Sequence, residues 1–422
     1  MSSTTRILLG LALGAAAGLF LAWFDPAHAA RAVLFAQPVG RLWLNALQMT
    51  VVPLVLALVI IGVSAANDAA ASGRTARRAL VVFALLLAAG AAFAAIVAPL
   101  ALSLLPRDAA LIASLRDAIP AEAAPAAVGF ADWFTAIIPT NAIAAAAQSA
   151  MLPLVVFALF FGFALTRIDA ARRERIVEFF QAIADTMIVI VQWVLWAAPL
   201  GVFALVLAVC ASAGASVLSA LGWYIALLCV MYLAVTLLLY PVAVVFGRVR
   251  LRRFASAILP AQVVAASTQS SLASLPAMVE SARDRLGQPR AVAALVLPMA
   301  VSLFRITSPI QYIGAASFVA WIYGIEVPPA QVAAAAALAV VISLGSVGLP
   351  GQVSFMATTM PVTAAMGLPV APLGLLLAVD TIPDVFATVG NVSADLTASS
   401  VVARAEAGAD PPAPAVADRG PS

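Results

Sequence analysis

The sequence has no lysine, one histidine and two cysteines among its 422 residues, and only 10% of them are charged. A single histidine, His28, excludes a histidine-cluster metalloenzyme. Cys210 and Cys229 both lie inside apolar segments, where they indicate neither a disulfide framework nor a metal site. Soluble domains carry about 25% charged residues, so the scarcity of charge also excludes an ordinary soluble fold.

Apolar residues make up 64% of the chain, in runs long enough to cross a bilayer. We therefore expect an all-α polytopic membrane protein in contact with membrane lipid. The arginines cluster in loops after every second run, so the net charge of +3 reflects topology and not a nucleic-acid partner. By the positive-inside rule these loops and both chain ends are cytoplasmic, which predicts a multi-pass protein of a bacterial cytoplasmic (inner) membrane.

Proline, glycine and arginine patterns set the expected bounds of the helices. Spanning helices are expected at about 7–24, 41–63, 79–104, 132–165, 186–210, 221–246, from 291 with a break around 305–309, and 373–404. Kinks are expected at Pro53 and Pro383, and interruptions at 137–141 and near Pro153. The first run resembles a signal peptide, but its length favours an uncleaved helix whose Gly10, Gly14 and Gly18 form a small packing face.

Two segments are too polar or too rich in glycine at their centres to span as plain helices. Residues 255–280 have a serine-rich centre, and residues 331–367 have a centre at 345–352 that reads GSVGLPGQ. Both patterns predict re-entrant hairpins, because non-helical backbone at membrane depth is tolerated only where protein or a water-filled cavity covers it. Two such hairpins, one opening from each side, predict an inverted repeat with a binding site at the membrane midplane.

The last apolar run carries polar groups on one face. Asp380, Asp384, Asn391 and Asp395 fall within an arc of about 60° on a helix, and each carboxylate in hydrocarbon costs about 2.5–3.5 kcal/mol. They are therefore expected to face a cavity, a partner or an ion path. A soluble helix with a wet side is the alternative, which the apolar opposite face disfavours. An enzyme is not expected, since no histidine or activated nucleophile accompanies the carboxylates.

Several motifs, taken in order, resemble the dicarboxylate/amino acid:cation symporter family, which includes glutamate and neutral amino acid transporters. They are MTVVPLV (49–55), IIPTN (137–141), MLPLVVFALFFGFAL (151–165), APLGVFAL (198–205), STQSSLASLP (267–276), VLP (296–298), GLPG (348–351) and DTIPDVFATVGNVSADLT (380–397). The resemblance implies eight transmembrane helices plus two re-entrant helical hairpins, inverted repeats, an elevator-type mechanism and a homotrimer. Residues 1–78 and 105–213 would form the scaffold, residues 79–104 and 214–404 the transport unit, and 405–422 a disordered tail.

The resemblance also implies roles for individual residues. Asp384 would hold the α-ammonium group of a small-molecule substrate, Asn391 its α-carboxylate, and Asn391 with Asp395 a sodium ion. Glycines at the second hairpin tip, Gly345, Gly348 and Gly351, would form the gate. The implied substrate site comprises Gln269, Ser270, Ser271, Arg305, Ser308, Gly348, Pro350, Gly351, Asp384, Ala387, Thr388 and Asn391.

Three departures from the family pattern change these expectations. Ala387 stands where the family has the arginine that holds an acidic side chain. The signature Asn-Met-Asp-Gly-Thr reads here Phe304-Arg305-Ile306-Thr307-Ser308, and the expected tyrosine and hydroxyls of the third helix are replaced by Phe83, Leu86 and Leu87. Hard cations need oxygen ligands, so one sodium site is not expected. No cofactor is expected, and Na⁺ or H⁺ remains as a coupling ion.

The presence of Arg305 within the altered signature is the third departure from the family pattern. Three hypotheses for its role stay open. It replaces a sodium ion electrostatically among Asp380, Asp384 and Asp395; it binds the substrate's carboxylate; or it forms a structural salt bridge. The sequence favours a secondary transporter of a non-acidic amino acid, with a dicarboxylate held by Arg305 still open. A ligand-gated sensor or anion conductance on the same scaffold is the alternative.

Overall fold

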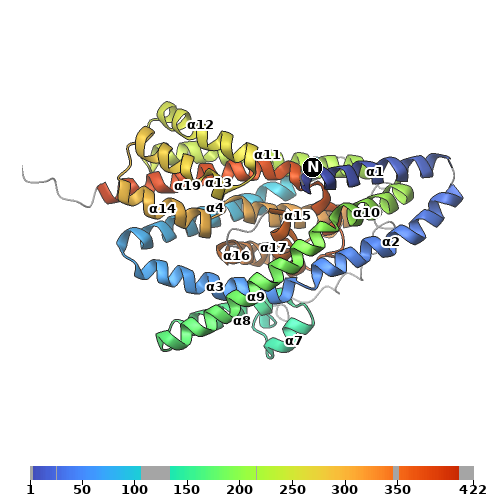
Figure 1. Cartoon of the computed structure of the whole chain (residues 1–422), viewed down its shortest axis with the longest axis horizontal. Coiled ribbons are helices and arrows are strands. Elements are labelled where there is room, and N and C mark those ends of the chain that lie inside the picture. The colour runs from blue at the N-terminus through green and yellow to red at the C-terminus, as the bar shows by residue number, and fades with distance from the viewer. Residues whose placement is uncertain (1–2, 25, 106–133, 215, 346–350, 408–422) are drawn as a thin grey trace, which may run out of the picture.

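The computed structural model describes residues 3–24, 26–105, 134–214, 216–345 and 351–407, and all regular structure within them is helical. Seven helical stretches of the described residues are long and apolar enough to cross a membrane. The helices, shown in Figure 1, are α1 (Ser3–Phe24), α2 (Pro26–Gln48), α3 (Val51–Ala71), α4 (Arg74–Ser103), α7 (Ala142–Ala147), α8 (Met151–Leu165), α9 (Ala170–Trp196), α10 (Ala198–Ala213), α11 (Ser216–Val245), α12 (Leu251–Thr268), α13 (Ser271–Glu280), the π-helical turn η1 (Ser281–Arg285), α14 (Arg290–Leu303), α15 (Thr307–Tyr323), α16 (Pro329–Gly345), α17 (Gly351–Ala365), α18 (Leu373–Val379) and α19 (Thr381–Ala407).

Four proline residues mark helix starts rather than kinks. Pro53, Pro153, Pro309 and Pro383 are each the third residue of a helix, in α3, α8, α15 and α19. Proline has no N–H to donate, and the first turn of a helix is where a missing N–H leaves no hydrogen bond unmade. The expected interruptions are therefore confirmed, but each chain break lies just before the proline.

Several expected loops are helical instead. Residues 26–40, which include His28 and lie between the first two expected helices, belong to α2, because this alanine-rich stretch favours a helix despite Pro38. The spanning helices expected from 79 and from 186 begin earlier, at Arg74 and Ala170. Most of the arginines expected in their preceding loops therefore lie in the first two turns of α4 and α9, whereas Arg167 precedes α9. The single helix expected at 186–210 is divided at Ala197, which lies between α9 and α10.

The glycine face of α1 packs against α10. A Cβ atom at Gly14 would lie 2.6 Å from the Phe203 carbonyl oxygen, and one at Gly18 would lie 2.7 Å from that of Leu207. Gly10 approaches the Pro199 carbonyl in the same way. These contacts confirm the expected small-residue face, since any side chain there would push the two helices apart.

Helices α12 and α13 form a helical hairpin that lies along α19. Its turn is at Gln269 and Ser270, as the serine-rich centre predicts. Gln262 Nε2 in α12 donates to Ser393 Oγ of α19 at 2.9 Å. The second pair, α16 and α17, packs against α3, α4, α8 and α15. Its tip at residues 346–350 lies outside the described residues.

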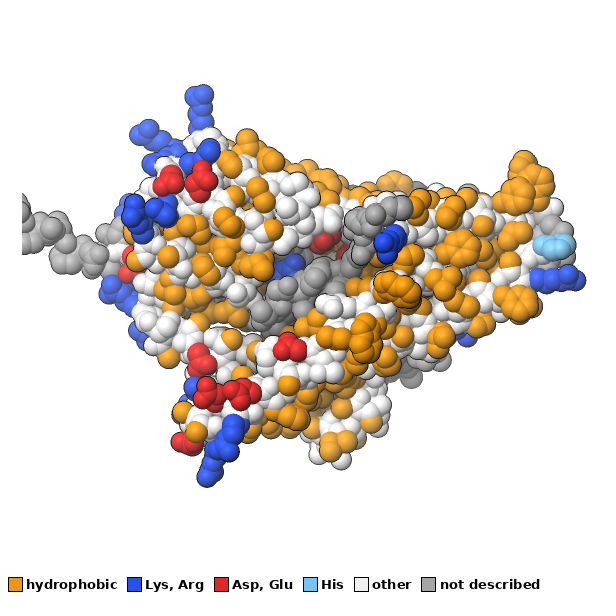
Figure 2. Space-filling model, viewed as in Figure 1, with side chains coloured by type: hydrophobic (Ala, Val, Ile, Leu, Met, Phe, Trp, Pro, Cys, Tyr) orange, Lys and Arg blue, Asp and Glu red, His pale blue; other side chains and the backbone are white. Residues whose placement is uncertain are grey.

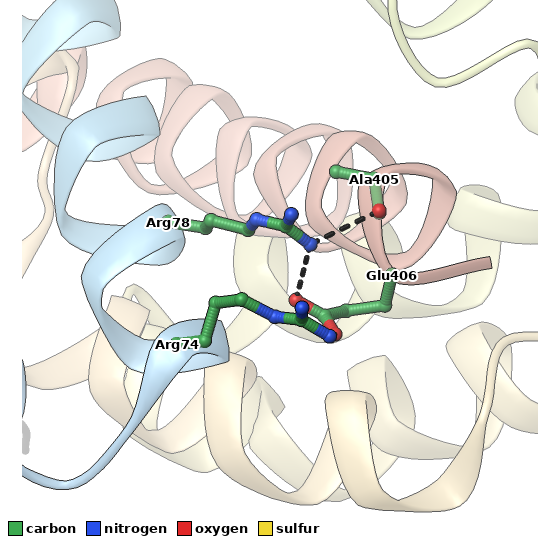
Figure 3. Close-up of polar contacts among 4 residues, drawn as sticks. All are labelled: Arg74, Arg78, Ala405 and Glu406. Atoms are coloured by element: carbon green, nitrogen blue, oxygen red, sulfur yellow. Dashed lines mark hydrogen bonds and ion pairs between the residues drawn. The ribbon is translucent and has the colours of Figure 1, made fainter. Parts of the chain in front are cut away.

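The C-terminal end of α19 is joined to the start of α4. Arg78 Nη1 donates to Glu406 Oε1 at 2.7 Å and to the Ala405 carbonyl oxygen at 3.0 Å, while Arg74 Nη2 lies 3.5 Å from Glu406 Oε2 (Figure 3). Helix α4 also packs against α15 and α16. In Figure 2 the charged side chains gather mainly at this end of the molecule, and most of the surface beyond it is hydrophobic.

Candidate substrate and ion site

Three interruptions of helical structure meet beside α19. They are the turn of the first hairpin at Gln269, the break between α14 and α15 at residues 304–306, and the break between α18 and α19 at Asp380. Gln269 adopts a left-handed conformation, with φ of 51°, and its Nε2 donates to the Thr381 carbonyl oxygen at 3.2 Å. The hairpin turn is therefore tied to the first residue of α19.

The α14–α15 break is joined to α19 through Asn391. Its Oδ1 accepts hydrogen bonds from Thr307 N at 3.1 Å and from Thr307 Oγ1 at 2.9 Å. Gly390 permits this approach, because a Cβ there would lie 2.8 Å from Thr307 Cγ2. Asn391 Oδ1 uses both of its lone pairs in these bonds, so a sodium ion at this oxygen would have to displace a bond to Thr307. The Nδ2 amide of Asn391 is a donor, which suits a carboxylate.

The polar face of the last run is buried, as the cost of carboxylates in hydrocarbon requires. Asp380, Asn391 and Asp395 are at most 2% exposed, and Asp384 is half-buried. Asp384 is therefore the carboxylate of this face that is most accessible to a small molecule. Thr388 is buried, and its Oγ1 donates to the Asp384 carbonyl oxygen at 2.9 Å.

Arg305 lies in the α14–α15 break, where its positive charge attracts the carboxylates of Asp384 and Asp395. Asp380 has a different partner, Gln311 of α15, whose Nε2 donates to both carboxylate oxygens at 2.9 Å. The sequence hypothesis placed Arg305 among all three aspartates. The charge of Arg305 acts on Asp384 and Asp395, while Asp380 is hydrogen-bonded to Gln311 and its charge is coupled to that of Asp384.

Asp395 is the most isolated carboxylate of the group. Both of its oxygens are buried and accept no hydrogen bond from the described residues. A buried ionised carboxylate without such bonds is costly, so the site suits a proton or a bound cation. Among the described residues no cluster of three or more His, Cys, Asp or Glu side chains could hold a metal ion, which leaves Asp395 to act with oxygen atoms of other kinds.

Aromatic and aliphatic side chains occupy the region where the resemblance places the other sodium ligands. Phe83 of α4 stacks on Phe304 with ring centroids 4.8 Å apart and planes 4° apart. Leu87 and Ile306 beside them are also buried. A Cβ at Gly90 would lie 3.1 Å from the Ile306 carbonyl oxygen, so α4 approaches the break closely. No oxygen ligand for a cation comes from the side chains of Phe83, Leu87, Phe304 or Ile306.

The remaining predicted residues are placed as follows. Ser270 Oγ accepts from Ala273 N at 3.2 Å and caps α13, whereas Ser271 Oγ is buried and has no hydrogen-bond partner among the described residues. Ser308 and Ala387 are buried. Gly345 ends α16 and Gly351 begins α17. Gly348 and Pro350 lie outside the described residues.

Sequence reasoning missed Gln311 and two tyrosines of α11. Tyr224 and Tyr232 are fully buried, their hydroxyls have no partner among the described residues, and the charge of Asp380 acts on both. The sequence did contain a pattern that could have indicated these residues. A glutamine interrupts the apolar run of α15, and two tyrosines lie eight residues apart on α11, so both helices carry polar groups on inward faces.

Comparison with known proteins identifies the family of this chain. The proton/glutamate-aspartate symporter of Escherichia coli (strain K12) is 28% identical over 410 residues, which cover 95% of this chain and 92% of that protein. The neutral amino acid transporter B(0) of Oryctolagus cuniculus is 31% identical over an alignment of 424 residues, which covers 92% of this chain and 76% of that transporter. A family model described as the sodium:dicarboxylate symporter family matches residues 4–405. The chain is a multi-pass membrane protein that belongs to the sodium:dicarboxylate symporter family.

Proposed function

We propose that the protein is a secondary active transporter of a small, non-acidic amino acid across a bacterial inner membrane. The observation that carries this proposal is the position of Arg305, whose charge acts on Asp384 and Asp395 beside the first hairpin turn. The similar proteins named above are symporters of glutamate and aspartate and transporters of neutral amino acids, which supports an amino acid as the solute.

The substrate class follows from which charges the site can balance. The half-buried carboxylate of Asp384 suits an α-ammonium group, and the Asn391 Nδ2 amide with the Ser271 hydroxyl suits an α-carboxylate. Ala387 offers no charge, so an acidic side chain in this pose would have no bidentate partner. A solute with a second carboxylate would have to compete with Asp384 and Asp395 for Arg305.

The proposal for ion coupling depends on the replacement of one sodium site's oxygen ligands by the fixed positive charge of Arg305. The Phe83–Phe304 stack fills one expected sodium position, and Arg305 supplies a permanent positive charge nearby, because a guanidinium does not deprotonate in proteins. Asp395, whose oxygens accept no hydrogen bond from the part of the chain that the structure describes, is the remaining place for one coupling ion, H⁺ or Na⁺. We therefore expect fewer coupling cations than a relative that keeps both of these oxygen-lined sites would bind.

Family membership supports the wider architecture that we propose. The two helical hairpins would be re-entrant, the arginine-rich end and both termini would face the cytoplasm, and the protein would assemble as a homotrimer. Helix α4 packs on α15, α16 and α19, which supports its movement with residues 214–404 as one transport unit. Residues 1–78 and 105–213 would form the static scaffold of an elevator mechanism.

Counterflow of labelled solute in proteoliposomes tests the proposal. Vesicles loaded with an unlabelled neutral amino acid should accumulate the labelled form, with a weaker response to aspartate or succinate. A ligand-gated sensor or an anion conductance on this scaffold shows solute binding without counterflow. Accumulation of a dicarboxylate, lost in an Arg305→Met variant, would instead assign Arg305 to the substrate's carboxylate.

A further inference from the structure

A hollow of about 740 Å³ opens at the arginine-rich end of the molecule, away from the proposed transport site. Three segments line it, at 247–253, 286–289 and 400–404. Four of its lining residues are arginines, and none of the described lining residues is acidic: Arg248, Arg250, Arg253 and Arg404. From Asp384 to Ser400 the helix α19 rises about 24 Å, so this hollow and the transport site are separate.

The backbone at Arg248 is held in an unfavourable conformation. Its φ is 53°, in the left-handed region where glycine is usual and where a Cβ atom crowds the following carbonyl oxygen. The bond from Val249 N to the Ala243 carbonyl oxygen, at 3.3 Å, closes the end of α11 around this residue. Glycine stands one position earlier, at Gly247, where a Cβ would lie 3.1 Å from Ser400 Cβ. The chain thus places an arginine where backbone energetics favour glycine.

The walls of the hollow are joined by hydrogen bonds. Gln288 is 9% exposed; its Nε2 donates to Ser400 Oγ at 2.9 Å, and its Oε1 accepts from Ser399 Oγ at 2.6 Å. Arg253 Nε donates to the Arg285 carbonyl oxygen at 2.9 Å, which orients its guanidinium group. The loop before α14 is therefore fixed to α19 and α12, and the cationic groups line a built cavity.

We propose that this hollow binds the phosphate group of an anionic ligand. Guanidinium groups hold phosphate oxygens in bidentate geometry, and four like charges in one hollow repel one another until an anion enters. The phosphate comes from an anionic phospholipid headgroup or from a soluble phosphate compound, because basic pockets at the cytoplasmic ends of membrane helices accept such headgroups. Occupancy joins α11, α12, α14 and α19 at the arginine-rich end.

Thermal unfolding of the purified full chain tests this site. The probes are inorganic phosphate and micelles that contain phosphatidylglycerol, with phosphatidylcholine micelles and chloride at equal ionic strength as references. A bound anion raises the melting temperature by mass action. The Arg250→Gln/Arg404→Gln variant removes two lining charges, and Arg252→Gln/Arg290→Gln is matched in charge but alters no lining residue.

The wild type and the matched control should be stabilised, and the lining variant should bind on the order of tenfold more weakly. Stabilisation by inorganic phosphate identifies a soluble ligand, and stabilisation by phosphatidylglycerol alone identifies a lipid headgroup. Equal responses of the two variants, or no response of the wild type to either probe, overturn the proposal.

A second variant, Arg248→Gly, separates the ligand role from the backbone conformation. Glycine relieves the left-handed conformation, so the protein without phosphate should be at least as stable as the wild type. The response to phosphate or phosphatidylglycerol should fall at the same time. A response as large as that of the wild type overturns the assignment of Arg248 to the site.

Discussion

Phe83 of α4 and Phe304 of the α14–α15 break stack face to face, with ring centroids 4.8 Å apart and an interplanar angle of 4°. Both rings are at most 1% exposed. The stack occupies the region where oxygen ligands for a cation are expected from the family resemblance, and Arg305 is the next residue along the chain. An apolar contact and a fixed positive charge are therefore found together at this break.

The first prediction concerns the stability that this stack contributes. Phe83→Ala leaves a cavity against Phe304, and loss of a buried phenylalanine side chain costs about 3–5 kcal/mol. Thermal unfolding in detergent should show a markedly lower melting temperature. Phe160→Ala is the control, since Phe160 is 63% exposed and its loss should change the melting temperature little. A Phe83→Ala protein as stable as the control would show that the stack is not part of the packed core.

The second prediction concerns the partner of Asp380. Gln311→Leu removes the amide that donates to both carboxylate oxygens, and a buried acceptor left unsatisfied costs about 1–3 kcal/mol, or more when it is charged. The melting temperature should fall, and it should recover when Asp380→Asn is added, because the second substitution removes the charge. Gln181→Leu on the exposed face of α9 should have little effect. If the melting temperature of the double variant did not recover, the loss of stability in Gln311→Leu would come from packing alone.

The third prediction concerns Asp395 as the remaining ion site. Asp395→Asn replaces, with a neutral group of equal size, a buried carboxylate whose oxygens accept no hydrogen bond from the described residues, so it removes the ionisable group with little change of shape. Counterflow in this variant should no longer respond to sodium or to pH. Asp284→Asn, at an exposed aspartate, should keep the full ion response. An ion response retained in Asp395→Asn would locate the coupling ion elsewhere.

The fourth prediction concerns the contact between α4 and α19 in Figure 3. Glu406→Gln weakens the ion pairs with Arg78 and Arg74, which lie near the protein surface and so contribute no more than about 1 kcal/mol. A double-mutant cycle with Arg78→Gln should give a coupling energy in that range, and it should shrink at high salt. A zero coupling energy at low salt would mean that the Arg78–Glu406 ion pair contributes nothing to the contact between the two helices.

The sequence predicted the helical class, the turn of the first hairpin and the polar face of α19, because each depends on local patterns of serine, glycine and spaced carboxylates. It placed the helix starts poorly. Pro53 and Pro383 suggested kinks, but proline is equally compatible with a first helical turn. Arginines suggested loops, although most of those before the third and fifth expected helices lie in the first two turns of α4 and α9.

Partner choice within the site could not be read from the sequence. Asp380, Asp384 and Asp395 lie on one helical face, so periodicity alone treats them as equivalent toward Arg305. Packing decides that Gln311 of α15 reaches Asp380, while Asp395 accepts no hydrogen bond within the described ranges. Such pairings depend on how α15 crosses α19, which is a tertiary property.

The most direct test of the account is the sodium dependence of solute binding, measured as thermal stabilisation of the wild type and of Arg305→Met. Arg305→Lys, which keeps the charge, is the control. If the guanidinium replaces a bound sodium ion, a neutral amino acid should stabilise the wild type and the lysine variant without sodium, and Arg305→Met should need sodium for any response. A wild-type response that depends on sodium as strongly as that of Arg305→Met would contradict the account.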